Sequence, residues 1–257
     1  MTFALVEGDC LHPLTGLACL ADRSVDHVIT DPPYEADAHT KGRRTKVDGW
    51  RKAMELGVRD GICVETPLPF VAITDEQRVA AAAQMARVAR RWILVFCQVE
   101  ASQKWAQALI AGGVQYIRTM IWVKPGAQPQ FTGDRPGVGY ESIVVAHRKG
   151  RKRWNGGGRV GVFTFSKGGT DGKTAHHPTT KPLPLMRELV DLFSDPGELI
   201  CDPYAGSGST GVAALMLGRN FLGWEIDAGY ATTAIRRLRG DEVRPDPRQP
   251  SLFGAYV

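Results

Sequence analysis

The sequence predicts an α/β protein built on one mostly parallel, seven-stranded sheet with helices on both faces. Short runs rich in β-branched and aromatic residues alternate along the chain with segments of helical periodicity. Such alternation is typical of parallel strands joined by crossover helices. The 257 residues are enough for one large domain without disulfide support. The sequence contains no repeat of fixed period, which argues against a solenoid or a propeller.

The expected strands cover residues 3–7, 25–30, 92–97, 114–123, 141–147, 198–201 and 221–226. The expected helices cover residues 75–91, 101–111, 183–194, 209–217 and 229–239. Thr74 and Gln77 form a capping-box pattern before an alanine-rich stretch, which supports the first helix. The strands 114–123 and 141–147 are joined by a Gly/Pro-rich loop without a helix. This connection predicts an antiparallel hairpin at one edge of the sheet.

We expect one domain over residues 1–239 and an extended tail over residues 240–257. The stretches 35–73 and 148–176 are long, polar or glycine-rich, and lack periodicity. Loops of that length in a compact domain are usually functional or disordered. These two stretches are therefore candidates for contacting a partner.

Composition excludes several classes of protein. The five cysteines are odd in number and form no CxxC pair, which argues against a disulfide framework or a thiolate zinc site. No apolar run approaches the roughly 18 residues that cross a bilayer. The N-terminus lacks a basic start followed by an apolar stretch, so we expect the protein to stay in the cytoplasm.

The positive charge is local. Seven Lys or Arg and no acid lie between Glu141 and Asp171, although the whole chain carries only +5. Clustered cations bind polyanions because they release counterions from phosphate backbones. An ordinary solvated surface is the alternative interpretation of the same charges.

A glycine-rich turn follows the strand 198–201. Gly206, Gly208 and Gly211 satisfy G-x-G-x-x-G, and Glu225 ends the next strand. This spacing is typical of a nucleotide-binding βαβ unit, in which the acid holds ribose hydroxyls. Asp202 at the mouth of the loop would repel a dinucleotide pyrophosphate but favour the cationic amino acid portion of S-adenosylmethionine. A tight strand-to-helix turn with no ligand is the structural alternative.

A second motif, Thr30-Asp31-Pro32-Pro33-Tyr34, ends the strand 25–30. Ligands of open α/β sheets bind beyond the carboxyl ends of the strands. The prolines leave rigid carbonyl acceptors beside a carboxylate and an aromatic ring. Such a cluster fits a planar base with an exocyclic amine, whose hydrogens Asp31 and the Pro32 carbonyl accept while Tyr34 stacks on the ring. A proline turn that only caps the strand is the alternative.

With these motifs the chain resembles the DNA amino-methyltransferases that modify adenine N6 or cytosine N4. VEGDC, VDHVITDPPY, YESIVVAHRKG, HHPTTKP, DPYAGSGSTG and FLGWEID occur in that order. A catalytic turn placed before the cofactor loop is similar to the beta-class arrangement of that family. The resemblance implies a Rossmann-like methyltransferase fold, S-adenosylmethionine as cofactor, and direct transfer to a base flipped out of double-stranded DNA.

The resemblance also implies roles for individual residues. The catalytic turn would be Asp31, Pro32, Pro33 and Tyr34. The cofactor would contact Asp9, Cys10, Asp31, Thr179, Lys181, Asp202, Tyr204, Ala205, Gly206, Ser207, Gly208, Ser209, Thr210 and Glu225. The family more often has Phe where Tyr204 stands, so this hydroxyl needs a partner. No second ligand cluster accompanies His176 and His177, so we expect no metal.

DNA contact is expected from two basic stretches. One contains Arg148, Lys149, Arg151, Lys152 and Arg153, and the other contains Lys41, Arg43, Arg44 and Trp50. We interpret the first as phosphate contacts, which position DNA without specifying its sequence. The second follows directly on the catalytic turn and could close over a flipped base.

The remaining expectations concern the substrate and partners. Asp at position 31 favours adenine N6, because DPPY goes mostly with adenine in the family and SPPY mostly with cytosine N4; cytosine N4 is the alternative. With so little recognition surface, either the target is short or unspecific or a second subunit contributes. The resemblance implies a homodimer, because beta-class relatives commonly form dimers, and a bacterial or prophage enzyme of restriction-modification type is the expected setting. The tail residues 249–253, Gln-Pro-Ser-Leu-Phe, resemble a sliding-clamp peptide, although they could instead pack on the protein. An NAD-dependent oxidoreductase would leave TDPPY unexplained, and a non-catalytic DNA-binding protein is the rival of another class.

Overall fold

The computed structural model describes residues 1–35, 43–46, 63–66, 72–127, 136–166 and 180–241. The chain forms two compact units: Met1–Pro32 with Arg78–Val257, and Pro33–Gln77. The first unit contains the large sheet and most of the expected elements. No helix in the described ranges combines the length and apolar character needed to cross a membrane.

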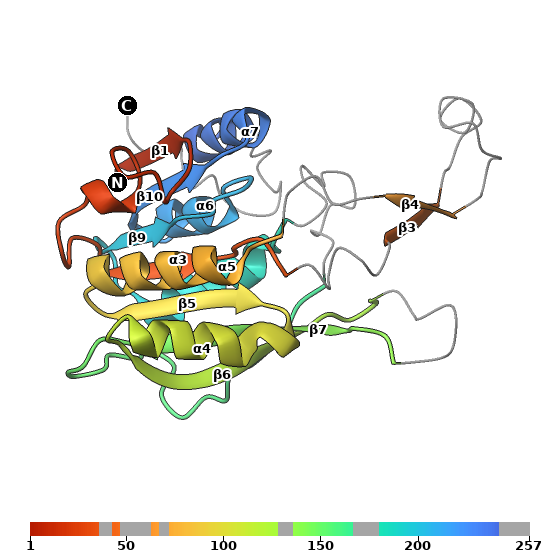
Figure 1. Cartoon of the computed structure of the whole chain (residues 1–257), viewed down its shortest axis with the longest axis horizontal. Coiled ribbons are helices and arrows are strands. Elements are labelled where there is room, and N and C mark those ends of the chain that lie inside the picture. The colour runs from red at the N-terminus through yellow and green to blue at the C-terminus, as the bar shows by residue number, and fades with distance from the viewer. Residues whose placement is uncertain (36–42, 47–62, 67–71, 128–135, 167–179, 242–257) are drawn as a thin grey trace. The chain divides into compact units, whose positions relative to one another are not determined.

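One sheet of eight strands organises the first unit (Figure 1). Its spatial order is β1-β10-β9-β2-β5-β7-β6-β8. The bounds in that order are Phe3–Glu7, Asn220–Glu225, Leu199–Asp202, His27–Thr30, Trp92–Cys97, Tyr140–His147, Gln115–Val123 and Val162–Thr164. All neighbouring strands pair in parallel except those beside β7, which is antiparallel to both β5 and β6.

The mostly parallel α/β fold is confirmed, and all seven expected strands are present within a few residues of their predicted bounds. The hairpin β6–β7 is also confirmed. An eighth strand, β8, pairs with the outer side of β6 and therefore takes the edge position. It lies in the stretch 148–176, where only three described residues adopt strand structure, too few to produce a recognisable alternation.

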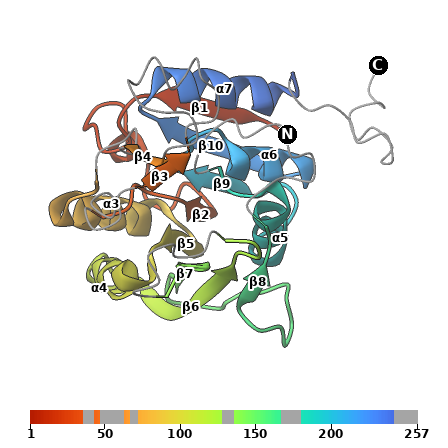
Figure 2. The same ribbon diagram turned by 90° about the vertical axis from the view of Figure 1, so that its right-hand side faces the viewer.

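Helices cover both faces of the sheet. Figure 2 shows α3 (Asp75–Val88) and α4 (Ser102–Ala111) on one side, and α5 (Leu183–Phe193) and α6 (Ser209–Met216) on the other. The last helix, α7 (Ala228–Arg239), packs on α6 and β1. Two 3-10 turns, Leu17–Cys19 and Val99–Ala101, complete the described elements of this unit. The double cover explains why every residue of β5 is buried, as expected for an inner strand of such a sheet.

The second unit contains a two-stranded antiparallel ribbon, β3 (Arg43–Lys46) and β4 (Cys63–Thr66). Both strands fall in the stretch 35–73, for which the sequence predicts a long loop. At the base of this unit the Ile73 N–H donates to the Tyr34 carbonyl at 3.3 Å. The expected capping box is confirmed, because the Gln77 N–H donates to Thr74 Oγ1 at 3.2 Å and the Thr74 N–H to Gln77 Oε1 at 3.0 Å.

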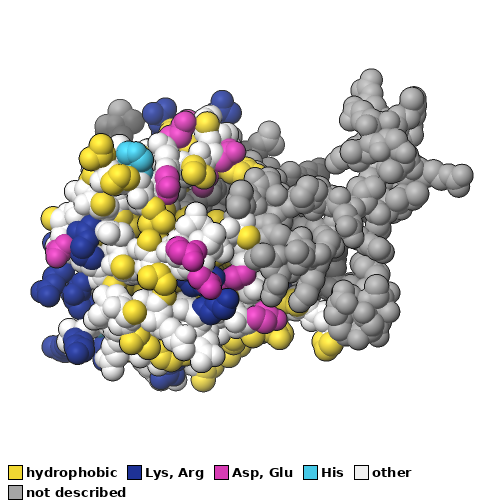
Figure 3. Space-filling model, in the orientation of Figure 1, with side chains coloured by type: hydrophobic (Ala, Val, Ile, Leu, Met, Phe, Trp, Pro, Cys, Tyr) yellow, Lys and Arg dark blue, Asp and Glu magenta, His cyan; other side chains and the backbone are white. Residues whose placement is uncertain are grey.

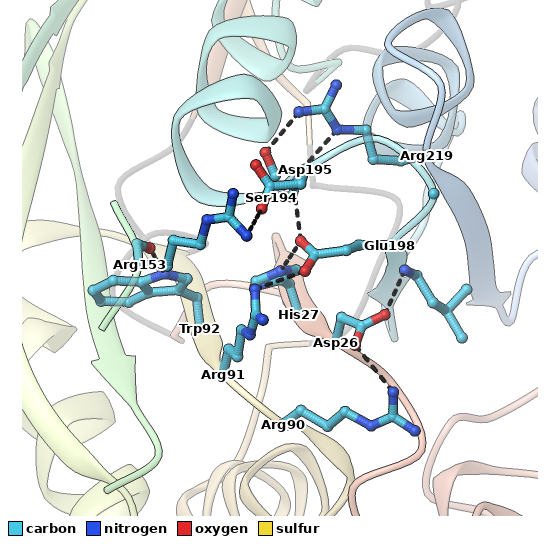
Figure 4. Close-up of polar contacts among 12 residues, drawn as sticks. Asp26, His27, Arg90, Arg91, Trp92, Arg153, Ser194, Asp195, Glu198 and Arg219 are labelled. Atoms are coloured by element: carbon cyan, nitrogen blue, oxygen red, sulfur yellow. Dashed lines mark hydrogen bonds and ion pairs between the residues drawn. The ribbon is translucent and has the colours of Figure 1, made fainter. Parts of the chain in front are cut away.

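Hydrogen bonds and ion pairs join the amino ends of the central strands (Figure 4). Glu198 accepts from His27 Nε2 at 2.8 Å and pairs with Arg91 at 2.6 Å. Burial alone would raise the pKa of Glu198, but the hydrogen bond from His27 and that from the Asp195 N–H outweigh it, and the pKa falls to about 2. This network lies at the amino ends of the strands, whereas the predicted motifs lie at the carboxyl ends.

We expect Gly211→Ala in α6 to destabilise the fold. A Cβ at this position would lie 2.6 Å from Leu238 Cδ2 and 2.7 Å from Phe221 Cδ1, both in buried residues. Overpacking of this kind costs about 1–3 kcal/mol, which exceeds the gain of roughly 1 kcal/mol in helix propensity from Gly to Ala.

Denaturant unfolding monitored by circular dichroism would measure the change in the free energy of unfolding. Gly158→Ala is the matched control, because a Cβ there meets nothing within 4 Å and the residue is exposed. Equal stability of the two variants would show that α6 does not need this close approach.

Candidate functional site

The two predicted motifs meet at the carboxyl edge of the sheet. Asp31 follows β2, and Asp202 ends the neighbouring strand β9. Thr30 Oγ1 donates a hydrogen bond of 2.7 Å to Asp202 Oδ1, across a sequence separation of 172 residues. The fold therefore brings the TDPPY turn and the glycine-rich turn together.

Asp202 is almost fully buried, with 2% of its surface exposed. Burial raises the pKa of its carboxyl to about 6, even though hydrogen bonds from Thr210, Thr30 and the Tyr204 N–H favour the ionised form. A buried carboxylate held by these neutral donors is well placed to gain a cation. It is therefore suited to receive a positively charged ligand group.

The glycine-rich turn has the backbone that its sequence predicts. Gly206 and Gly208 have φ angles of +54° and +80°, in the left-handed region that favours glycine. A Cβ on Gly206 would meet nothing within 4 Å, so open space faces the loop there. A Cβ on Gly208 would lie 3.1 Å from that of Ala234 in α7. Gly208 also caps α6, whose first N–H groups face the same edge.

Glu225, at the end of β10, holds this turn from the other side. Its carboxylate accepts from the Gly206 N–H at 2.7 Å and from the Asp227 N–H at 2.8 Å. Burial raises its pKa, while these hydrogen bonds act in the opposite direction. Glu225 thus shapes the loop in addition to the ligand role predicted for it.

Cys10 and Tyr204 form a buried pair beside the turn. The Tyr204 hydroxyl and the Cys10 thiol are hydrogen-bonded, so this thiol is the partner that the tyrosine hydroxyl requires. Burial raises the pKa of Cys10 to about 12 and also raises that of Tyr204. Both groups therefore stay neutral near pH 7. The preceding Asp9 accepts from the Leu11 N–H at 2.8 Å and turns the chain after β1.

Lys181 lies against the other motif. Its ammonium group donates to Asp31 Oδ2 and is also 3.3 Å from Glu141 Oε2. Burial would lower the pKa of Lys181, but the carboxylates of Asp31 and Glu141 outweigh it and raise the pKa. The lysine predicted to line a cofactor pocket is thus bound to the predicted catalytic carboxylate.

Thr180 connects this segment to the glycine-rich turn, since its Oγ1 lies 3.3 Å from Ser207 Oγ. Arg237 of α7 donates to the carbonyl of Ser207 and, at 3.0 Å, to its hydroxyl. Neither Thr180 nor Arg237 is among the site residues predicted from the sequence. Arg237 carries no sequence signal of this role, because a basic residue in the last turn of a helix is ordinary.

Comparisons with known proteins agree with this arrangement. The model of a family described as "DNA methylase" (N6_N4_Mtase) matches residues 162–236. A protein of Escherichia coli (strain K12) described as the methylase YubD is 27% identical over 238 residues, which cover 91% of this chain and 88% of that protein. The Type II methyltransferase M.HinfI of Haemophilus influenzae is 25% identical over 275 residues, which cover 98% of this chain and 72% of that protein.

The chain is thus similar to proteins named as DNA methylases and methyltransferases over most of its length.

Solved structures of similar fold include the M1.HpyAVI–SAM complex, with a TM-score of 0.66 and 23% identity, covering 92% of this chain and 99% of that one. The cytosine-N4-specific PvuII DNA methyltransferase has a TM-score of 0.69 and 13% identity, with 97% and 89% covered. TTHA0409 of Thermus thermophilus, solved with S-adenosyl-L-methionine, has a TM-score of 0.62 and 18% identity, with 93% and 94% covered. The methyltransferase fold expected from the sequence is therefore confirmed.

Several predicted site residues fall elsewhere. Pro33 and Tyr34 begin the second compact unit. Arg43 and Arg44 are in β3 of that unit. Lys41, Trp50 and Thr179 lie outside the described residues, as do His176, His177 and the tail residues 242–257. In the described ranges no three His, Cys, Asp or Glu side chains are grouped as metal ligands would be.

The basic stretch 148–153 follows the end of β7, at the sheet edge opposite to Asp31 and Asp202. Arg148 donates to the carbonyls of Ala86, Arg87 and Ala89 at the end of α3, so its guanidinium has a structural partner. Arg153 pairs with Asp195 at 2.8 Å. Lys and Arg side chains gather at the end of the molecule where β5 begins (Figures 1 and 3).

The structure thus does not bring the stretch 148–153 together with the site. Lys149, Arg151 and Lys152 are exposed, and their contact with DNA stays a prediction. The reason for the separation is β7 itself: an antiparallel strand that starts at the carboxyl edge must end at the other edge.

We expect Thr30→Val to raise the pKa of Asp202 above about 6. The substitution keeps the shape of the side chain but removes the hydrogen bond that favours the ionised carboxylate. NMR titration of the ¹³C-labelled aspartate carboxyls would follow the change. Thr30→Ser retains the hydroxyl and serves as the control. An unchanged pKa in the valine variant would show that the two motifs are not coupled through this bond.

Proposed function

We propose that the chain transfers a methyl group from S-adenosylmethionine to the N6 amine of adenine in double-stranded DNA. The main support for this proposal is the arrangement of contacts around Asp31. One of its oxygens binds Lys181, while the other, Oδ1, is buried and has no hydrogen-bond partner among the described residues. A buried acceptor of this kind, next to Asp202 and the glycine-rich turn, is suited to an amine hydrogen.

The cofactor site fits the residues present. Asp202 offers a buried carboxylate to the ammonium of the methionine portion, and the turn 205–208 offers open space at Gly206. Glu225 and Asp9 are placed at the same edge for the ribose and the adenine ring, as the family resemblance implies. Similar folds solved with this cofactor, M1.HpyAVI and TTHA0409, support the assignment. When bound, S-adenosylmethionine supplies an electrophilic methyl group on a positively charged sulfur.

The chain's own residues act on the amine. Asp31 Oδ1 and the Pro32 carbonyl accept its two hydrogens, which draws the nitrogen lone pair out of conjugation with the ring. The stacking role of Tyr34 stays a prediction from the sequence. The base must leave the duplex to reach these groups, at a cost of a few kcal/mol. Neither Cys10 nor Cys201 is needed as a nucleophile, and burial keeps both thiols protonated by raising their pKa.

Adenine is favoured over cytosine because Asp, rather than Ser, precedes the two prolines. Cytosine N4 is the second candidate, since one similar fold is named as cytosine-N4-specific. We also propose that the enzyme works in the bacterial cytoplasm as a homodimer, in the setting of restriction-modification. A non-catalytic DNA-binding role would require that no methyl transfer occurs on any DNA.

We expect the wild-type protein to produce N6-methyladenine in DNA and Asp31→Ala to lose this activity by at least about 100-fold. The reason is that the variant lacks the acceptor for the amine but keeps Asp202 and the glycine-rich turn. Mass spectrometry of nucleosides measures the product, and calorimetry measures cofactor binding, which should persist.

Asp26→Asn is the matched control, because Asp26 stands at the other end of β2 and holds the Leu199 N–H and Arg90. N4-methylcytosine as the product would refute the adenine assignment. Normal turnover in Asp31→Ala would refute the role of the turn.

Cofactor binding should weaken at acid pH. The Asp202 carboxyl, with a pKa of about 6 without ligand, must ionise to receive an ammonium group. Its protonated fraction grows as the pH falls below 6, so the Kd should rise roughly tenfold per pH unit, since 1.36 kcal/mol corresponds to one pKa unit.

Calorimetric Kd values between pH 4.5 and 8 would reveal this slope. Asp202→Asn should bind more weakly and without the slope, whereas Thr15→Ala at an exposed site should retain it. A wild-type Kd that does not vary over this range would contradict the placement of the ammonium at Asp202.

A further inference from the structure

Four charged side chains of alternating sign, three of them buried, extend from the catalytic turn into the hairpin. Asp31 forms an ion pair with Lys181. The Nζ atom of Lys181 also lies 3.3 Å from Oε2 of Glu141, and Glu141 forms an ion pair with Lys124. Glu141 lies at the start of β7, and Lys124 directly follows the end of β6. Lys181 and Glu141 make further contacts as well. The series is continuous, so a change at one member affects the next.

The series is shielded from water. The side chains of Lys124, Glu141 and Lys181 are 7%, 10% and 8% exposed, whereas that of Asp31 is 25% exposed. The Lys181 ammonium lies 5.1 Å from the centre of the Phe96 ring, and the Lys124 ammonium lies 4.9 Å from that of Trp122. Two cations and two anions sum to zero charge. Neutrality as a group reduces the cost of burying them, and removal of one member leaves an unbalanced charge.

Asp31 is the most exposed member of the series, and its Oδ1 is the oxygen assigned to the substrate amine. Lys181 holds the opposite oxygen, so it fixes the plane of the carboxylate. Glu141 competes with Asp31 for the same ammonium group, and Lys124 limits that competition by pairing with Glu141. The strength with which Lys181 holds Asp31 therefore depends on both residues of the hairpin.

We propose that Glu141 and Lys124 are positioning residues for methyl transfer, acting on Asp31 through Lys181. This inference rests on the proposed function for its link to the reaction, but the interaction itself can be tested without it. The hairpin thus contributes to the site although none of its residues contacts the substrate amine in this scheme.

Lys124 and Glu141 have opposite effects on the pKa of Asp31. Burial raises the pKa of Asp31, Lys181 and Lys124 lower it, and Glu141 raises it. Burial likewise lowers the pKa of Lys124, against the effect of Glu141. Asp202 of β9 is a further carboxylate beside Asp31, and the charge of Asp31 raises the pKa of Asp202. Thr30 hydrogen-bonds to Asp202 but carries no charge.

Lys124→Met should therefore raise the pKa of Asp31, and Glu141→Gln should lower it. Since the ionised carboxylate accepts the amine hydrogen, the acid limb of the single-turnover rate should move to higher pH in the first variant and to lower pH in the second. Shifts of about one pH unit are expected for neighbouring charges of this kind. The double variant should return toward the wild-type limb, because the two charges are removed together.

Two measurements test the inference: ¹³C NMR titration of the Asp31 carboxyl in the intact protein, and single-turnover methyl transfer to DNA from pH 4.5 to 9. Glu198→Gln is the matched control, because it removes a partly buried, ion-paired glutamate at the opposite sheet edge. That variant should lose stability but leave both the Asp31 titration and the acid limb unchanged.

Opposite shifts in the two single variants would support the positioning role, since a purely structural effect would change the folded fraction rather than the titration. Unmoved Asp31 titrations in folded variants would overturn it, even if the wild type transfers methyl groups. Shifted titrations in a protein without transferase activity on any DNA would instead retain the coupling and reject the proposed function.

Discussion

Two carboxylates, Asp31 and Asp202, must be kept close together at one edge of the sheet, and much of the site follows from that constraint. The charge of Asp31 raises the pKa of Asp202, as expected for neighbouring carboxylates. The structure separates their surroundings: Asp202 is held by neutral hydroxyl and amide donors, whereas Asp31 is held by the ammonium of Lys181. Asp202 thereby keeps its charge for a cationic ligand group, while Asp31 keeps a single oxygen available.

The sequence predicted the elements that position these groups better than the contacts among them. Seven strands and five helices follow from periodicity, and the placement of Asp31 and Asp202 at one edge follows from the rule that ligands bind at carboxyl ends of parallel strands. The glycine-rich turn was predictable because Gly206 and Gly208 need positive φ angles. Such local requirements are visible in the sequence because each is met within a few residues.

Contacts between distant segments left no comparable signal. Lys124 and Glu141 are ordinary residues at strand ends, and only the pairing of β6 with β7 brings them together. Arg148 shows the same limit from the other side: the basic run gives no sign that its guanidinium donates to carbonyls at the end of α3. Charge patterns in a sequence do not distinguish a cation facing solvent from one that satisfies buried backbone.

The antiparallel strand explains how the hairpin reaches the site. In a wholly parallel sheet each strand contributes only its last residues to the carboxyl edge, and its first residues lie at the far edge. Because β7 runs the other way, its first residues, including Glu141, lie beside the end of β6 and Lys124. The reversal therefore brings Glu141 to the edge at which β6, which runs in the same direction as β5, already ends next to Lys124. A parallel strand in the place of β7 would put the Glu141 position at the edge of Glu198, and Lys181 would then have Asp31 as its only carboxylate in the series.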